Sequence, residues 1–193
     1  VANLPGENAQ SVAEYCVMAM LLLARNAMPI TAAMRTQPWD EARKLAMAAR
    51  EIAGLTVGIV GVGEIGRRVA KICRSGFGMR VLGNQRRMDR LPPEAEGASL
   101  DELVAESDFV VIACPLTPET QHLFNANRLG AMKREAWLIN VGRGAVVDET
   151  ALYEALRDKR IAGAGLDVFE QEPVDPANPL LKLDNVVLDP ADP

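Results

Sequence analysis

The chain has 193 residues, of which 49% are hydrophobic and 24% charged, and its net charge at pH 7 is −5. This length can bury a sizeable core in one domain, or at most two, and the composition is typical of a soluble globular protein. The acidic balance argues against a nucleic-acid partner. The longest apolar run, residues 16–24, is too short to span a bilayer, so we expect no membrane partner. The three cysteines, Cys16, Cys73 and Cys114, lie far apart in apolar runs, which is typical of reduced core thiols in a cytoplasmic protein.

The first quarter of the chain is predicted to be mainly helical. Ser11, with Glu14 three residues later, has the pattern of a capping box and predicts a helix from Ser11 to about Met34. That helix is apolar nearly all round, which requires deep burial or cover by a second subunit. Residues 40–50 predict a further, exposed helix.

A glycine-rich turn follows, on which the rest of the interpretation depends. An apolar strand, Thr56–Val60, precedes three glycines at the spacing G-x-G-x-x-G, and an amphipathic helix, Glu64–Phe77, follows them. Gly61 permits a tight turn, Gly63 lets the backbone approach a pyrophosphate, and Gly66 lets the helix pack closely on the strand. The free N–H groups at the start of the helix then face the phosphates. Because a strand precedes the motif and a helix follows it, the pattern predicts a dinucleotide site rather than an ordinary glycine-rich turn.

Strands and helices alternate through the remainder of the chain. We expect strands at 79–83, 108–114, 136–141, 163–168 and 185–188, a loop at 85–97, and helices that begin at Ser99, Thr117 and Asp148. Ser99 and Glu102 form a second capping-box pattern, and Pro118 suits the first position of a helix. The alternation predicts the α/β class: a Rossmann-type, doubly wound parallel sheet in a three-layer αβα arrangement, with residues 1–193 as one dinucleotide-binding domain.

In such sheets ligands bind beyond the carboxyl ends of the strands. The residues expected there, around one crevice, are Gln85, Arg86, Arg87, Pro115, Thr117, Gly142, Arg143, Asp167, Glu172 and residues 189–193. Val141, just before Gly142, is also expected to bind the cofactor. Arg143 lies in a glycine-flanked loop from which it can reach a bound anion, or it is a surface arginine in a turn. Asp167 accepts a hydrogen bond from a nicotinamide amide or caps a backbone turn, and Glu172 has the alternative of a plain loop carboxylate.

Gln85 bears on the choice of cofactor. NAD sites usually carry Asp or Glu about 20 residues beyond the glycines, where it binds the ribose 2′-hydroxyl. Here that place holds a neutral residue, and Arg86 and Arg87 follow it. Arginines attract a 2′-phosphate, so the sequence favours NADP(H), with NAD possible, over the alternative of a solvated basic loop. His122, the only histidine, follows a predicted helix start, and we expect a structural role for it; no metal site is predicted.

Several segments together resemble the cofactor domain of the D-2-hydroxyacid dehydrogenases. They are Leu4-Pro5-Gly6 with Asn8, Ser11–Glu14, the glycine motif, Pro115–Thr120, Asn140–Gly144, and Leu166–Phe169 followed by Glu172-Pro173. The segments occur in the family's order and spacing and extend over essentially the whole chain. The basic stretch at Gln85-Arg86-Arg87 resembles the NADP-preferring members, such as the glyoxylate, hydroxypyruvate and 2-ketogluconate reductases.

The resemblance implies a role for each matched position. Arg143 would bind the carboxylate and carbonyl of a 2-oxo acid, and Glu172 would hold a catalytic histidine and raise its pKa. The remaining roles concern the cofactor: Gly61, Gly63, Glu64, Ile65 and Gly66 would hold the pyrophosphate, Pro115 and Thr117 would line the cleft, and Asp167 would meet the nicotinamide amide. Hydride would pass from the nicotinamide to C2, and the histidine would protonate the developing alkoxide.

Two departures from the family leave two functions open. Ala191 stands where the family's histidine is expected. Three origins of this alanine stay open: a genuine loss of the histidine, an engineered change, or a non-native end of the chain. The family's separate substrate domain is also missing, so we expect the chain to be the cofactor domain of a longer enzyme. It is either part of an active oxidoreductase or a catalytically silent module that binds dinucleotide and dimerises. The family pairs through this domain, with the first long helix against the partner, which implies a homodimer.

Overall fold

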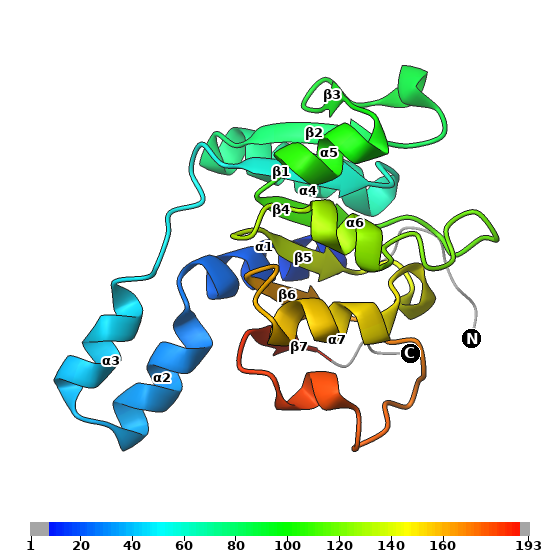
Figure 1. The fold of residues 1–193 in the computed structure, drawn as a ribbon. Helices are drawn as coiled ribbons and strands as arrows, with labels where there is room; N and C mark the ends of the chain where they lie inside the picture. Colours follow the sequence, from blue (N-terminus) through cyan, green and yellow to red (C-terminus); the bar gives the residue numbers. More distant parts are fainter. Residues whose placement is uncertain (1–7, 190–193) are drawn as a thin grey trace.

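A parallel sheet of seven strands organises the computed structural model, which describes residues 8–189 (Figure 1). The strand order is β3-β2-β1-β4-β5-β6-β7, and every neighbouring pair runs parallel. The strands are β1 (Thr56–Val60), β2 (Arg80–Asn84), β3 (Glu96–Gly97), β4 (Phe109–Ile112), β5 (Trp137–Asn140), β6 (Gly163–Leu166) and β7 (Val186–Leu188). The chain builds outward from β1 to β3 and then returns to add β4 on the other side of β1. The gap between β1 and β4 is therefore the switch point at which such sheets bind ligands.

Helices cover both faces of this sheet. They are α1 (Ala9–Ala24), α2 (Ala27–Thr36), α3 (Trp39–Ala46), α4 (Glu64–Phe77), α5 (Leu100–Glu106), α6 (Ala126–Ala131) and α7 (Glu149–Arg157). Helices α1 and α4 pack on one face, and α5, α6 and α7 cover the other, while α2 and α3 form an arm that projects from the sheet (Figure 1). The predicted three-layer αβα architecture is confirmed.

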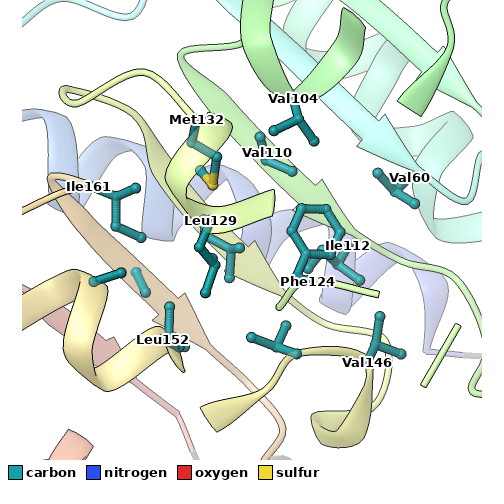
Figure 2. Close-up of a cluster of buried hydrophobic side chains, with 14 of the residues drawn as sticks. Val60, Val104, Val110, Ile112, Phe124, Leu129, Met132, Val146, Leu152 and Ile161 are labelled. Carbon is teal, nitrogen blue, oxygen red and sulfur yellow. The ribbon is translucent and has the colours of Figure 1, made fainter. Parts of the chain in front are cut away.

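The central strands are mainly apolar because both of their faces are buried. In β4, Phe109 and Val111 contribute to the core beneath α1 and α4, whereas Val110 and Ile112 point into the core on the opposite face. Figure 2 shows this second core, in which Phe124 and Leu129 are almost fully buried beside Val110 and Ile112. Alternate residues of one strand thus serve two different cores.

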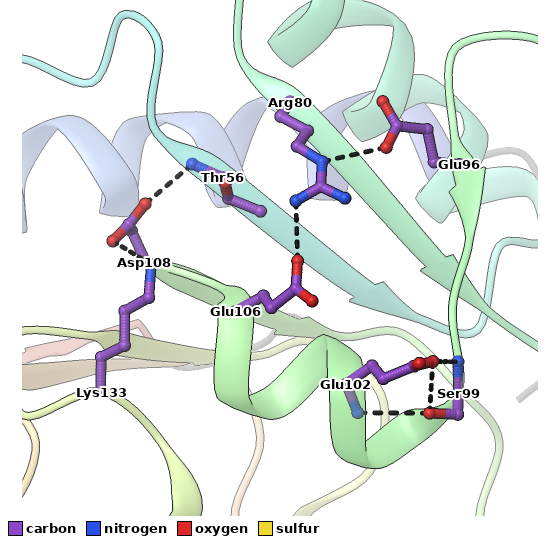
Figure 3. Close-up of polar contacts among 8 residues, drawn as sticks. All are labelled: Thr56, Arg80, Glu96, Ser99, Glu102, Glu106, Asp108 and Lys133. Atoms are coloured by element: carbon purple, nitrogen blue, oxygen red, sulfur yellow. Dashed lines mark hydrogen bonds and ion pairs between the residues drawn. The ribbon is translucent and has the colours of Figure 1, made fainter.

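Polar contacts stabilise the amino ends of the strands (Figure 3). The Asp108 carboxylate accepts hydrogen bonds of 2.9 Å from the Thr56 N–H and from Lys133 Nζ, which ties β1 to β4. Arg80, the first residue of β2, donates to Glu96 at 2.9 Å and to Glu106 at 2.7 Å. These contacts lie at the opposite end of the sheet from the expected crevice, so they support the fold rather than the site.

Several local predictions are confirmed. Strand β1 and helix α4 have the predicted bounds, and Ser99 and Glu102 form the predicted capping box at the start of α5 (Figure 3). Asp148 caps α7 by accepting a 3.0 Å hydrogen bond from the Ala151 N–H. The three cysteines are free and buried, and burial raises the pKa of each thiol, so they are neutral near pH 7.

The prediction for the first helix is wrong at both ends. Helix α1 begins at Ala9 behind Asn8, and Ser11 Oγ donates to the Asn8 carbonyl at 2.8 Å instead of forming a capping box. The helix then breaks at Asn26, whose φ is +52°, a left-handed conformation that asparagine tolerates. The Asn26 side chain donates to the Leu45 carbonyl at 3.3 Å, so contact with α3 stabilises the break.

Helix α3 is also shorter than the predicted span of residues 40–50. Among the described residues no single helix is long and apolar enough to cross a membrane; α1 and α2 reach that length only together, bent by 55°.

The predicted helix start at Thr117 is also wrong. Residues 117–122 form a turn, in which Thr120 Oγ1 accepts from the Thr117 N–H and donates to the Pro115 carbonyl, both at 2.7 Å. Helix α6 begins only after Asn125, whose side chain caps the Arg128 N–H. The predicted loop 85–97 contains a 3-10 turn at Met88–Arg90 and the two-residue strand β3. The bounds of the other predicted strands differ from the observed ones by at most two residues at either end.

Candidate functional site

The turn after β1 leaves no space for a side chain at two of its three motif glycines. Gly61 has φ +94°, and a Cβ atom placed there would lie 2.6 Å from the Cys114 backbone nitrogen. A Cβ atom at Gly66 would lie 2.5 Å from the Gly61 carbonyl oxygen. Gly63 is different, because a Cβ atom there would meet no atom of the described chain within 4 Å. Two glycines therefore serve packing, and the third presents bare backbone to open space.

The same open space faces the start of helix α4. No side chain among residues 8–189 caps this helix at Gly63, although other helices of the chain have such caps. The first N–H groups of a helix have no partner within the helix, and they carry its partial positive charge. An uncapped start of a 14-residue helix beside bare glycine backbone fits the diphosphate of a dinucleotide.

A cavity of about 430 Å³ lies next to this turn, at the carboxyl ends of β4 and β5. Its lining residues come from α4 and from the segments that follow the two strands: Ile65, Ala113, Cys114, Pro115, Leu116, Val141, Gly142 and Arg143. The structure thus brings together five predicted site residues, Ile65, Pro115, Val141, Gly142 and Arg143. Thr117 is not part of the lining; its backbone N–H is bonded within the turn.

The loop that carries Arg143 is held on both sides. A Cβ atom at Gly142 would lie 2.6 Å from the Cys114 carbonyl oxygen, and Gly144 packs directly against the Phe169 backbone. Arg143 itself is exposed, and its Nη1 donates to the Gly142 carbonyl at 2.7 Å. Asn140, a buried residue to which the sequence interpretation gave no role, donates from Nδ2 to the Arg143 carbonyl at 3.1 Å. A polar residue at the end of the apolar run Trp-Leu-Ile-Asn is the signal that could have identified it.

Carboxylates gather after β6 and β7. Asp167 is half-buried, and burial, followed by the nearby charges of Asp189 and Glu172, raises its pKa to about 6. Glu172 is exposed, and its Oε1 accepts a 3.0 Å hydrogen bond from the Phe169 N–H. The Tyr15 hydroxyl of α1 is buried near these groups without a hydrogen-bond partner in the described chain. Neither Asp167 nor Glu172 lines the cavity. Asp167 lies next to the strand end at the cavity, because its N–H donates to the Asn140 carbonyl at 3.1 Å.

The predicted basic residues lie on the far side of the glycine turn, in the loop after β2. Gln85 donates from Nε2 to the Arg87 carbonyl at 2.8 Å, and the Arg86 and Arg87 side chains are exposed. The pKa of Glu119, in the turn after β4, is lowered first by a hydrogen bond from the Thr117 hydroxyl and also by the charge of Arg86. Gln85, Arg86 and Arg87 do not line the cavity.

His122 lies in the turn before α6 rather than along a helix, with φ +46°. Its Nε2 is 2.6 Å from Glu170 Oε1, so it joins this turn to the loop after β6 and does not line the cavity. Ala191 and the segment Leu4-Pro5-Gly6 lie outside the described residues.

A doubly wound parallel sheet with a glycine turn at its switch point defines a dinucleotide-binding domain. The model of one family, described as "D-isomer specific 2-hydroxyacid dehydrogenase, NAD binding domain", matches residues 17–190. The chain is 44% identical to a glyoxylate reductase of Korarchaeum cryptofilum over 98% of this chain and 58% of that protein. It is 41% identical to a glyoxylate/hydroxypyruvate reductase B of Salmonella newport over 97% of this chain and 59% of that protein. The chain belongs to the D-isomer specific 2-hydroxyacid dehydrogenase family, and it spans rather more than half the length of these relatives.

Solved structures agree with this assignment. An NAD-dependent formate dehydrogenase from Staphylococcus aureus, in complex with NAD, is similar with a TM-score of 0.89 and 32% identity, over 95% of this chain and 55% of that one. An acyclic imino acid reductase in complex with NADPH and D-Arg is similar with a TM-score of 0.84 and 32% identity, over 96% of this chain and 58% of that one. The predicted fold class and family are confirmed, and these relatives include binders of either nicotinamide cofactor.

Two glycine substitutions should separate packing from ligand binding. Gly66→Ala places a methyl group against backbone that cannot yield, so we expect it to lower the free energy of unfolding by about 1–3 kcal/mol. Gly63→Ala should cost less than about 1 kcal/mol, because it alters only a helix cap, while it weakens dinucleotide binding about tenfold or more. Urea unfolding and calorimetric titration with NADPH and NADH measure both effects. Unchanged affinity in Gly63→Ala would place the diphosphate elsewhere.

Asp167 should make the folded domain less stable as the pH rises from about 4 to about 6. Its pKa of about 6 in the folded chain exceeds its ordinary value of 3.8, so over this interval the folded state binds more protons than the unfolded state. Asp167→Asn cannot lose a proton, and its free energy of unfolding should therefore fall less than that of the wild type across the interval. Asp158→Asn is the control, since Asp158 is exposed and its pKa is lowered by Arg157. Parallel profiles for wild type and Asp167→Asn, from urea unfolding at a series of pH values, would refute this assignment.

Proposed function

We propose that the chain is the cofactor-binding domain of an NADP(H)-dependent reductase, which transfers a hydride between the nicotinamide and C2 of a small 2-oxo acid. The observation that carries the proposal is the meeting of three features at the carboxyl ends of β1, β4 and β5: the open backbone at Gly63, the uncapped start of α4 and the cavity lined by Arg143. The first two suit a diphosphate, and the third suits an anionic substrate beside it.

The residues divide the work by their chemistry. A bound nicotinamide supplies or accepts the hydride. The pyrophosphate is held by the turn and the helix start, which comprise Gly61, Gly63, Glu64, Ile65 and Gly66. Pro115, Val141 and Gly142 line the cavity and exclude water around the cofactor, and Thr117 lies in the turn that follows Pro115. Asp167 accepts a hydrogen bond from the nicotinamide amide. The Arg143 guanidinium binds the carboxylate and carbonyl of the 2-oxo acid. Glu172 would orient a histidine general acid at position 191, where this chain has alanine.

The preference for NADP(H) rests on charge. Gln85 has no carboxylate to repel a 2′-phosphate, and Arg86 and Arg87 are exposed beside it. Arg87 Nη2 lies 3.7 Å from Asp89 Oδ2, so a 2′-phosphate competes with that carboxylate for the arginine. NAD remains the second cofactor of the site, since one relative of known structure is bound to it.

We also propose that the domain pairs with a second copy of itself in the cytoplasm. The arm formed by α2 and α3 projects from the sheet (Figure 1), and it exposes Met28, Met34, Trp39 and Met47. Large apolar side chains that remain exposed on a projecting element are typical of protein–protein contacts. Three free, buried thiols are consistent with a reducing compartment.

A silent binding module is the second candidate function, and Ala191 is the feature that favours it. Loss of a general acid lowers a rate by a factor of about 10² to 10⁴. We expect this chain to bind NADPH in calorimetry but to show no turnover of glyoxylate or hydroxypyruvate. A longer form that includes the substrate domain should gain activity on Ala191→His. Absence of any dinucleotide binding would refute both candidates, and absence of a rate gain would leave only the silent module.

The basic loop should decide the cofactor. Arg86→Ala and Arg87→Ala each remove a charge-assisted partner of the 2′-phosphate, so we expect NADPH affinity to fall about tenfold or more while NADH affinity changes little. Arg160→Ala, at an exposed site after α7, is the matched control and should change neither affinity. Titration of the wild type that shows tighter binding of NADH would reject the proposed preference.

A further inference from the structure

Asn140 is an unusual residue for the core of this domain. It ends the apolar strand β5, and its side chain is only 1% exposed. Within residues 8–189, Asn140 and Ser107 are the only buried residues whose side chain is polar and not aromatic. Burial of an amide is costly unless its donors and acceptor are bonded, so the partners of Asn140 indicate what its position requires.

The oxygen and the nitrogen of the Asn140 side-chain amide both form hydrogen bonds with the same short loop. Oδ1 accepts from the Gly142 N–H at 3.1 Å, and Nδ2 donates to the Arg143 carbonyl at 3.1 Å. The Asn140 backbone carbonyl accepts from the Asp167 N–H, also at 3.1 Å. One buried residue thus contacts the backbone of Gly142, Arg143 and Asp167, which carry three of the groups assigned to the site.

Packing leaves the loop little freedom beyond these bonds. Gly142 is pressed against the Cys114 carbonyl, and Gly144 against the backbone of Phe169. Arg143 lies between these two glycines, and the bond from Asn140 fixes the direction of its carbonyl. Because the backbone of Arg143 is set in this way, its long side chain starts from one place at the rim of the cavity.

We infer that Asn140 is a positioning residue for Arg143: its amide holds the Val141–Gly144 loop so that the guanidinium lies at the cavity, ready for a small carboxylate anion. This inference rests on the anion-binding role of Arg143 in the proposed function. Asn140 does not touch the anion itself. It lowers the entropy lost when Arg143 binds, because the backbone that carries the arginine is already ordered.

Trypsin cleaves after exposed arginines and lysines, so it tests without any ligand whether Asn140 holds the Val141–Gly144 loop. In Asn140→Ala the loop loses both side-chain bonds, and cleavage between Arg143 and Gly144, followed by mass spectrometry, should become at least several-fold faster. Asn185→Ala is the matched control. Asn185 donates to the carbonyls of Leu156 and Ala162 at 3.3 and 3.2 Å, away from this loop, so its loss should not change cleavage at Arg143.

A conservative variant distinguishes positioning from general destabilisation. Asn140→Asp keeps an acceptor for the Gly142 N–H and loses the donor to the Arg143 carbonyl, so its cleavage rate should lie between those of the wild type and Asn140→Ala. Cleavage after Lys71, in the middle of α4, requires that helix to unfold and serves as the reference for global unfolding within each digest. Equal acceleration at both bonds, or no acceleration at Arg143, would overturn the inference.

Oxalate, a dianion with the shape of a 2-oxo acid, tests the second half. Calorimetry on the NADPH-saturated chain compares the wild type, Asn140→Ala, Arg143→Ala and the double variant. We expect Asn140→Ala to weaken oxalate binding about tenfold in the wild-type background and to have no effect once Arg143 is absent. The same factor in both backgrounds would mean that Asn140 acts without Arg143.

The two proposals fail in different ways. If Arg143→Ala binds oxalate as tightly as the wild type, the anion role in the proposed function is wrong, although trypsin still decides whether Asn140 holds the loop. If Arg143→Ala weakens binding and Asn140→Ala does not, the proposed function survives and the positioning role is wrong.

Discussion

Three backbone contacts that leave no room for side chains hold the centre of this domain together. Gly66 of α4 lies against the Gly61 carbonyl, Gly61 lies against the Cys114 backbone, and Gly142 lies against the Cys114 carbonyl. The contacts form one row that joins α4, β1, β4 and β5 at the carboxyl edge of the sheet. A side chain at any of these glycines would push apart elements that are packed at close distance. The geometry of the cavity depends on this row, because Gly142 and Cys114 line the cavity and Ile65 precedes Gly66.

Helix α4 and strand β1 were predicted to the residue, because a buried strand, a glycine turn and an amphipathic helix are encoded by neighbouring residues. The elements that were missed depend on distant partners. The break at Asn26 is stabilised by the Leu45 carbonyl on another helix. Strand β3 has two residues and exists only through its pairing with β2. Thr117 and Pro118 have the composition of a helix start, but Thr120 closes a turn on Pro115.

The candidate site could be predicted in part for the same reason. Topology alone places residues that follow strands at one edge, and Ile65, Pro115 and Arg143 do line one cavity. Sequence order does not reveal how far each side chain reaches, and neither Arg86 nor Asp167 lines the cavity. The role of Asn140 was not predicted, because the sequence pattern indicates only that it is the last residue of a strand. Its role becomes visible only when the loop that folds back over it is known.

The charges around the cavity favour one orientation of the proposed cofactor. Exposed arginines follow β2 on one side of the glycine turn, and Asp167, Asp189 and Glu172 gather after β6 and β7 on the other. The proposed cofactor, NADP, carries a 2′-phosphate on its adenosine half, and its oxidised nicotinamide ring is positive. The 2′-phosphate is therefore favoured near the arginines, and the ring near the carboxylates. Arg143 lies between these regions, where the negative charge of a 2-oxo acid needs a cation because the neighbouring carboxylates would otherwise repel it.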